Sequence, residues 1–309
     1  MSPTQGIDSP KPVVSFEGSR DWQSLTCSIP ESLARDLWDR CRVTGQSIGK
    51  VVASALAEHL QSDLSAIYQV STAGALVHGL YKGDTTIASL REHGDFGLGT
   101  FDGLDGEMVA FDGVFYQVRG NGKVVIPPLE TRTPYAMVTR FPGAGVKKIG
   151  PVNSFEQLRS RLDRLRTSDN IFYAIRIDGS FESVLTRSVF PTEEGCPLAE
   201  AASHQHEFPL KTIRGTLVGF WSPGYLSTVL VAGYHLHFLS EDKLAGGHLL
   251  DCSASDLHVQ ICPEADFRLT LPETRSFLGA DLSGDPTADL RKAESSIHGD
   301  SSPTPNQRA

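Results

Sequence analysis

One stretch near the end of the chain, residues 233–251, constrains the fold most because it has the pattern of a β-hairpin that carries three histidines. In its first half the side chains alternate, so His235 and His237 lie on one face of a predicted strand. Residues 240–247 are polar and then glycine-rich, which suits a reversal. His248 opens the return strand, and the three imidazoles are therefore expected on an antiparallel pair of strands.

This spacing of histidines predicts a metal site. Two imidazoles at positions i and i+2 of one strand, and a third from the partner strand, can close on a single ion. Three neutral imidazoles with one open position are expected of a catalytic zinc site, whereas structural zinc favours four ligands, often cysteines. A His-x-His alone also fits a half-buried strand with two polar positions in water, but the third histidine after the glycine turn favours a metal.

Length, charge and cysteine content limit the class of protein. A chain of 309 residues forms one large domain or two. Its formal net charge of −9, without a long basic run, argues against nucleic acid as a partner. The five cysteines are widely spaced and include no Cys-x-x-Cys pair, which indicates reduced thiols rather than disulfides. Without an apolar signal segment or a run of 18 apolar residues, we expect a cytoplasmic protein with no membrane span.

The N-terminal fifth of the chain differs from the rest. Residues 1–21 are rich in Ser, Pro and Gly and are predicted to be disordered. Residues 22–62 have the order strand, helix, glycine turn and helix, which resembles a ribbon-helix-helix unit. Such units dimerise through their strands, and in repressors the strands bind DNA. Between residues 22 and 61 four basic and four acidic residues cancel, which is poor for binding phosphate, so a packing or dimerisation appendage is favoured and a homodimer is expected.

Residues 63–295 predict a strand-rich, mixed α/β domain, followed by a flexible tail over 296–309. Strands over 172–177 and 181–189 are expected to join at a turn, Asp178-Gly179. The glycine-rich run 94–106 allows tight reversals.

A second His-x-His, His204 and His206, has polar neighbours and no strand alternation, so it is predicted to be a loop rather than a metal site. Two charged residues remain open on sequence alone. Glu107 enters an apolar strand after a glycine turn, either as a strand-start residue in water or as a positioned acid or base. Arg187 lies near a strand end, where arginines commonly form surface ion pairs.

Several separated motifs together resemble the alpha-acetolactate decarboxylase family over residues 66 to about 295. The motifs are His-Gly-Asp-Phe-Gly-Leu-Gly-Thr-Phe (93–101), Gly-Leu-Asp-Gly-Glu (103–107), Thr-Arg-Ser-Val (186–189), Arg-Gly-Thr-Leu-Val-Gly-Phe-Trp (214–221) and the histidine hairpin. The resemblance implies a two-subdomain, mixed β-sheet fold. The chain departs from the family at residues 223–225, Pro-Gly-Tyr in place of a frequent Pro-Glu-Tyr, and residues 1–62 lie outside the family's usual extent.

The resemblance also implies a set of site residues. The family's zinc ligands fall on His235, His237 and His248. Its catalytic polar residues fall on Glu107, Arg187 and a C-terminal glutamate that Glu294 matches best, and Thr100 matches a threonine that lines the family's site.

The implied reaction is the zinc-dependent decarboxylation of (S)-2-acetolactate to (R)-acetoin and CO2. Loss of CO2 from this 2-hydroxy-3-oxo acid gives an enediolate, whose charge a zinc ion stabilises as a Lewis acid. Arg187 suits the carboxylate or the developing charge, because guanidinium offers paired donors. Glu107 suits transfer of the proton to C2, and Glu294 is a further acid/base or metal-side group. The sequence leaves open which group delivers the proton.

Two other functions compete with this one. His-x-His followed by Glu241 loosely resembles the metal-binding box of a cupin-like enzyme, although the upstream glycine spacing is missing. The second alternative is a regulator or binding protein that is built on residues 22–62 and carries a decayed decarboxylase domain. The complete set of histidines, with Glu107 and Arg187, argues against decay.

Overall fold

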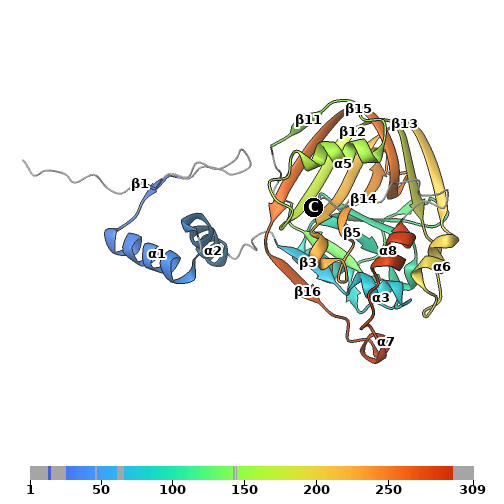
Figure 1. Cartoon of the computed structure of the whole chain (residues 1–309), viewed down its shortest axis with the longest axis horizontal. Helices are drawn as coiled ribbons and strands as arrows, with labels where there is room; N and C mark the ends of the chain where they lie inside the picture. The colour runs from blue at the N-terminus through green and yellow to red at the C-terminus, as the bar shows by residue number, and fades with distance from the viewer. Residues whose placement is uncertain are drawn as a thin grey trace, which may run out of the picture. The chain divides into compact units, whose positions relative to one another are not determined.

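A computed structural model describes residues 13–14, 26–45, 47–60, 66–141, 143 and 145–294 of the chain. The chain divides into two compact units, Met1–Leu64 and Ser65–Ala309 (Figure 1). None of the described helices is long and apolar enough to cross a membrane. The disorder predicted for residues 1–21 falls outside the described residues except at Val13–Val14, and the tail predicted over 296–309 falls outside them entirely.

The first unit contains a short strand pair and two helices. Strand β1 (Val13–Val14) pairs antiparallel with β2 (Cys27–Ser28), and helices α1 (Glu31–Thr44) and α2 (Ile48–Leu60) follow. Helix α1 ends at Gly45, whose φ of 69° is the left-handed conformation that glycine adopts without strain. Both helices lie where the sequence predicts them. The ribbon-helix-helix assignment and the homodimer stay predictions.

The second unit is built on two large sheets. The first has seven strands in the order β16 (Phe267–Thr270), β3 (Ile67–Val70), β10 (Ala136–Thr139), β5 (Phe96–Thr100), β6 (Glu107–Phe111), β7 (Val114–Val118) and β8 (Val124–Val125). The second has five, in the order β11 (Lys147–Ile149), β15 (Gly246–Glu264), β12 (Phe172–Ser188), β13 (His206–Ser222) and β14 (Gly233–Ser240). β4 (Thr85–Thr86) pairs with β9 (Arg132–Thr133). The predicted strand-rich, mixed α/β architecture is confirmed.

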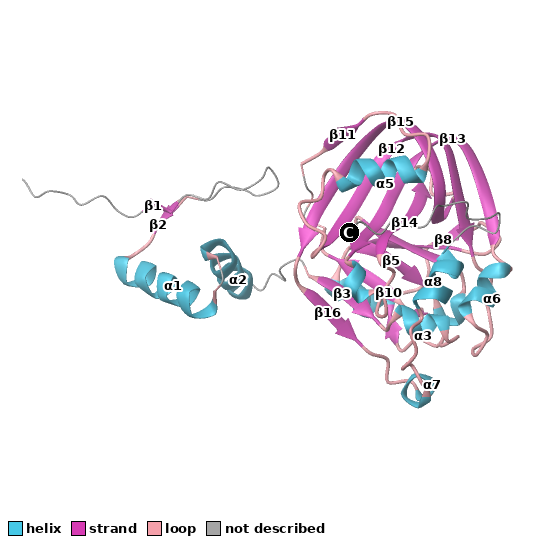
Figure 2. Cartoon of the chain, viewed as in Figure 1, coloured by secondary structure: helices cyan, strands magenta, loops and turns pink. Residues whose placement is uncertain are grey.

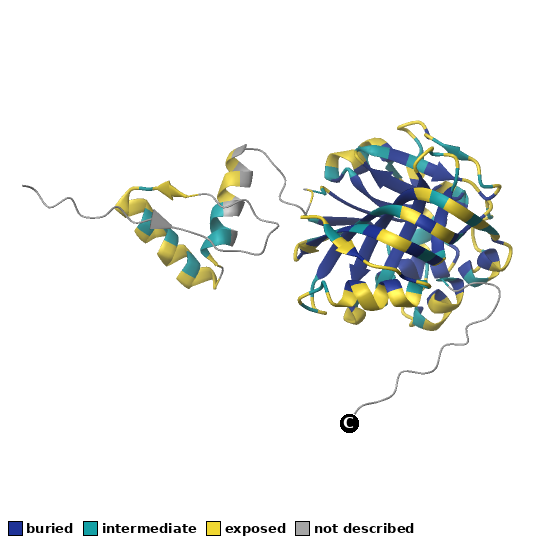
Figure 3. Ribbon diagram, turned by 90° about the horizontal axis from the view of Figure 1, so that it is seen from above, coloured by how far each residue is buried: buried dark blue, intermediate teal, exposed yellow. Residues whose placement is uncertain are grey.

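Four strands of the second sheet close into a ring of pairings. Strand β12 pairs with both β13 and β15, and β14 pairs with the same two strands. Strands β13, β14 and β15 also contact β6 of the first sheet. The hairpin that carries the histidines therefore lies where the two sheets meet, and its residues 235–240 and 246–249 are buried. Figure 3 shows that buried residues fill the interior of this unit.

Short helices cover the sheets (Figure 2). Helices α3 (Ala73–Val77), α6 (Leu198–Ser203) and α8 (Thr287–Glu294) contact one another and form one group. Helix α5 (Phe155–Asp163), capped by the Ser154 hydroxyl, packs against β15. The remaining helical segments are α4 (Ile87–His93), α7 (Arg275–Gly279) and the 3₁₀ turns η1 (Asp102–Leu104) and η2 (Gly224–Leu226).

The structure corrects three local predictions. The turn at Asp178-Gly179 is wrong, because β12 runs through it and pairs with neighbours on both sides. A Cβ at Gly179 would come within 2.9 Å of the Asp256 carbonyl oxygen and 2.5 Å of the Leu257 side chain, so glycine permits the close approach of β15 there. Within the run 94–106, Gly97 and Gly99 do not make reversals either. They lie inside β5. A Cβ at Gly97 would collide with the Met137 carbonyl of β10, and one at Gly99 with the carbonyl of Tyr135, the residue that precedes β10.

The third correction concerns the second His-x-His. His206 does not lie in a loop but begins β13, and its exposed ring stacks on Phe208 at a centroid separation of 4.8 Å. His204 lies just after α6. Neither belongs to the group of described residues that could hold a metal.

Candidate active site and metal centre

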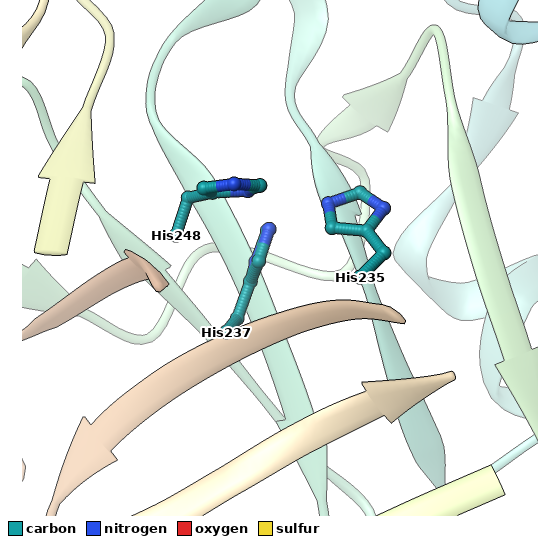
Figure 4. Close-up of side chains that lie close together, drawn as sticks. All are labelled: His235, His237 and His248. Carbon is teal, nitrogen blue, oxygen red and sulfur yellow. The ribbon is translucent and has the colours of Figure 1, made fainter. Parts of the chain in front are cut away.

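Three histidines converge at the junction of the two sheets (Figure 4). His237 and His248 are direct partners in the antiparallel pair of β14 and β15, and His235 lies two residues before His237 on the same face. One ring nitrogen from each lies within 4.8 Å of those from the other two, and all three side chains are buried. The structure thus brings together the three residues that the sequence pattern singles out.

The protonation of these rings suits metal binding. His237 Nδ1 donates a hydrogen bond to the Met108 carbonyl at 2.7 Å, which leaves the Nε2 lone pair free to face the cluster. Neither His237 Nε2 nor His235 Nδ1 has a hydrogen-bond partner within the described part of the chain, although both are buried. Burial lowers the pKa of His235 to about 3 and that of His237 and His248 well below 6.5. The rings are therefore neutral, as metal ligands must be.

Two glutamates flank the histidines. Glu107, the first residue of β6, places Oε2 3.6 Å from His237 Nε2. Glu294, the last residue of α8, places Oε2 3.2 Å from His248 Nε2. Burial raises the pKa of Glu107 to about 7, with Arg187 acting to lower it and Glu294 to raise it. Burial also raises the pKa of Glu294, against the lowering effect of Arg187.

Arg187 is the buried cation of the site. It lies on β12 directly opposite His248 of β15, and only 4% of the residue is exposed. One terminal nitrogen donates to Gln205 Oε1 at 2.7 Å and the other lies 3.5 Å from Glu294 Oε1. Its Nε has no partner among the described residues. One guanidinium thus faces the buried Glu107 and the half-buried Glu294, and a bound metal cation would offset the excess negative charge.

Thr100 supports the turn that leads into Glu107. The two residues are paired across β5 and β6. The Thr100 hydroxyl donates to the Gly106 carbonyl at 2.7 Å, and Gly106 has a φ of 84°. A Cβ at Gly106 would collide with the Val118 carbonyl, so glycine is required there. This turn fixes where β6 begins and hence where the Glu107 carboxylate lies.

These groups line one pocket, whose empty space, counted together with the solvent at its opening, is about 500 Å³. Its polar side holds the three histidines, Glu107, Arg187, Glu294 and Thr100. Its apolar side consists of Ala73, Leu76, Leu104, Leu198, Val231 and Leu290. All seven residues that the sequence analysis proposes therefore meet in a single cavity.

Two polar residues of this region were not predicted from the sequence. Tyr135 lines the pocket, and its hydroxyl is buried without a partner among the described residues. Gln205 lies between His204 and His206, in the segment that was predicted to be a loop. Its side-chain oxygen accepts a hydrogen bond from the Arg187 guanidinium. Neither has a sequence signal, because a tyrosine at a strand start and a glutamine in a polar segment are ordinary. Glu241, which suggested a cupin-like box, is exposed and pairs with Arg214 at 3.1 Å.

Comparisons with known proteins give one consistent result. The family model for alpha-acetolactate decarboxylase matches residues 67–284. The alpha-acetolactate decarboxylase of Methylococcus capsulatus is 43% identical over 230 residues, covering 74% of this chain and 88% of that protein. The Bacillus licheniformis protein of the same name is 40% identical over 227 residues, covering 72% and 88%. Glu294 lies beyond the part that the family model matches.

Solved structures agree with the sequence comparisons. The crystal structure of alpha-acetolactate decarboxylase from Bacillus subtilis strain 168 has a TM-score of 0.73 at 39% identity, covering 75% of this chain and all of that one. A Staphylococcus aureus protein of unknown function, described as similar to alpha-acetolactate decarboxylase, has a TM-score of 0.70 at 30% identity, covering 74% and 99%.

Proposed function

The chain belongs to the alpha-acetolactate decarboxylase family, whose members are carboxy-lyases, and from this membership we propose that it converts (S)-2-acetolactate to (R)-acetoin and CO2. We further propose that His235, His237 and His248 hold a zinc ion. The observation that carries both proposals is the meeting of three neutral, buried imidazoles with a buried arginine and two glutamates in one pocket.

Zinc is the metal that fits this donor set best. Three histidines with an open fourth position are the ligands of catalytic zinc sites. The buried His237 Nε2 has no partner among the described residues, and its lone pair is one that a metal would satisfy. Zinc bound there would act as a Lewis acid and stabilise the negative charge that develops on the substrate oxygens as CO2 leaves.

Arg187 is proposed to bind the anionic end of the substrate. Its guanidinium is buried, stays charged, and retains an unpartnered Nε. Gln205 and Glu294 hold its terminal nitrogens, so the group is oriented before substrate enters. Paired donors on a fixed guanidinium recognise a carboxylate with both charge and geometry.

The two glutamates are proposed to handle protons. Glu107, with a pKa near 7 in the metal-free protein, can hold a proton or release it at neutral pH, which suits delivery to C2. Glu294 touches both His248 and Arg187, so it acts either on the metal side or as a further acid or base. The apolar wall, with Leu76, Leu104 and Leu290, accepts the methyl groups and keeps water away.

The remaining parts of the proposal concern assembly and location. Residues 22–62 are proposed to be a dimerisation or packing appendage, and the protein a cytoplasmic homodimer. An assay for acetoin, run beside measurement of bound zinc, tests the main proposal. We expect acetoin from the wild-type enzyme with one zinc per chain. A folded, zinc-loaded protein that releases no acetoin would contradict it.

A further inference from the structure

The hydroxyl of Tyr135 is a buried polar group whose proton has no acceptor among the described residues. The residue is 2% exposed and lines the same pocket as the histidines. Its phenol oxygen has no hydrogen-bond partner among the described residues. Native proteins rarely leave a buried hydroxyl unsatisfied, and such groups call for an explanation in terms of a ligand or function.

The other polar atoms of Tyr135 are fully used. Its N–H donates to the Thr133 hydroxyl oxygen at 3.1 Å. Its carbonyl accepts from that hydroxyl at 2.8 Å and from the Thr100 N–H at 3.0 Å. A Cβ at Gly99 would collide with this carbonyl, so glycine permits the close approach. These hydrogen bonds hold the backbone of Tyr135 against β5, the strand that carries Thr100. The side-chain hydroxyl is then the polar group of Tyr135 that is available to a ligand.

The hydroxyl also lies within electrostatic reach of the site. The charge of Glu294 adds to the effect of burial and raises the pKa of Tyr135, while the backbone N–H of Val231, which is directed at the phenol oxygen, acts to lower it. That N–H can only donate to the oxygen, so the hydroxyl proton still has no acceptor among the described residues. Both of these neighbours line the pocket. Because burial has the largest effect, the phenol keeps its proton at neutral pH and can act as a hydrogen-bond donor.

Two other buried tyrosines, Tyr81 and Tyr173, have partners for their hydroxyls. Tyr81 donates to the Cys196 carbonyl at 2.8 Å. Tyr173 accepts from the backbone N–H groups of Thr167 and Ser168, each at 3.0 Å. These hydroxyls stabilise loops, and neither tyrosine lines the pocket. The contrast separates Tyr135 from a structural tyrosine.

We propose that Tyr135 is a substrate-binding residue of this enzyme, whose hydroxyl donates a hydrogen bond to an oxygen of the bound 2-hydroxy-3-oxo acid. The inference rests on the proposed function and adds a residue to it. Tyr135 supplies a neutral donor on the side of the pocket formed by β5 and the start of β10, whereas Arg187 supplies a charged donor from β12.

The test compares Tyr135→Phe with Tyr173→Phe. Tyr135→Phe removes a hydroxyl that has no internal partner, so the melting temperature and zinc content should stay at wild-type values. Its kcat/KM should fall about 10- to 100-fold, as expected for a lost hydrogen bond to an anionic ligand. Tyr173→Phe removes hydrogen bonds to the loop at 167–168, so its melting temperature should fall while its kcat/KM stays within about twofold of wild type.

A second readout does not depend on turnover. The compound 2,3-dihydroxy-2-methylbutanoate keeps every oxygen of the substrate but lacks the ketone that permits decarboxylation. It should bind Tyr135→Phe about tenfold more weakly than wild type by calorimetry. Equal affinity and equal kcat/KM in the two proteins would overturn the inference, as would a lowered melting temperature that explains the whole loss.

The proposed function and this inference can fail separately. A wild-type enzyme that binds the diol but releases no acetoin would contradict the decarboxylase activity, and the diol comparison would then decide the role of Tyr135. A wild-type enzyme that releases acetoin at the same rate as Tyr135→Phe would contradict only the inference. Failure of the wild-type protein to bind the diol at all would count against both.

Discussion

The guanidinium of Arg187 lies 3.5 Å from the carboxylate of Glu294, and this contact joins β12 to the C-terminal end of α8. The same carboxylate reaches His248 at 3.2 Å. A helix that follows the matched family region thus completes a site whose histidines, Glu107, Thr100 and Arg187 come from the two sheets. Arg187 and Glu294 orient each other, and each should depend on the other for its position.

Replacing Arg187 by lysine tests whether paired donors matter beyond charge. Lysine keeps the positive charge but cannot reach Gln205 and the substrate carboxylate with a planar fork. We expect kcat/KM to fall about 100-fold, in line with the 1.5–3 kcal/mol typical of a hydrogen bond to a charged group. Bound zinc should stay near the wild-type level. Steady-state kinetics that match wild type would show that Arg187 acts only as a charge.

The protonation of Glu107 should make the stability of the metal-free protein depend on pH. Its pKa is about 7 when folded, against an ordinary value of 4.5, so the folded state binds more protons between these values. Stability therefore falls as pH rises from about 4.5 to 7. The difference of about 2.5 units corresponds to about 3–4 kcal/mol at ~1.4 kcal/mol per unit.

Glu107→Gln isolates this effect. The metal-free variant should be more stable than metal-free wild type at pH 8, by up to about 3–4 kcal/mol, and about equal to it at pH 4. Denaturant unfolding at the two pH values measures the difference. The same loss of stability with rising pH in both proteins would mean that another group causes it.

His237→Ala tests the metal centre. The variant should lose bound zinc and about 10³-fold or more in kcat, because Lewis-acid stabilisation is worth several kcal/mol. The fold should survive, since the change removes one hydrogen bond, to the Met108 carbonyl, and costs about 1–3 kcal/mol.

His204→Ala is the matched control for that variant. His204 belongs to the other His-x-His, is exposed and lies outside the histidine group. It should keep wild-type zinc content and turnover. Full activity in a zinc-free His237→Ala protein would remove the basis of the metal proposal.

Deleting residues 1–62 removes nearly all of the first unit and tests whether the second one is active without it. The two units are compact by themselves, and every residue proposed for the site lies in the second one. Turnover per chain should stay within about twofold of wild type, while the mass measured by light scattering should fall if the first unit supports the homodimer. A folded truncation without activity would show that the first unit contributes to the site.

Local patterns predicted much of the fold. The histidine hairpin and the order of helix, glycine turn and helix within residues 22–62 follow from alternation, periodicity and glycine, which act over a few residues. The turn at Asp178-Gly179 was wrong because the pairing of β12 with β13 and β15 outweighs a local turn signal. Glycine there serves the close approach of another strand, which sequence spacing does not reveal.

Part of the candidate site was predicted from the sequence, and two of its polar residues were not. The three histidines follow from their spacing, whereas Glu107, Arg187, Glu294 and Thr100 were identified through the resemblance to the family, and all seven lie in one pocket. Tyr135 and Gln205 have neither signal, and their importance depends on which atoms surround them. An unpartnered hydroxyl and a donor fixed by an amide oxygen are properties of three-dimensional packing.

The most direct test of the central proposal is acetoin release from racemic acetolactate before chelation, after chelation, and after zinc is added back. The account predicts that the chelated enzyme loses about 10³-fold or more of its turnover and that zinc restores it. Acetoin formation that persists in fully zinc-free enzyme, or a zinc-loaded, folded enzyme that forms none, would contradict it.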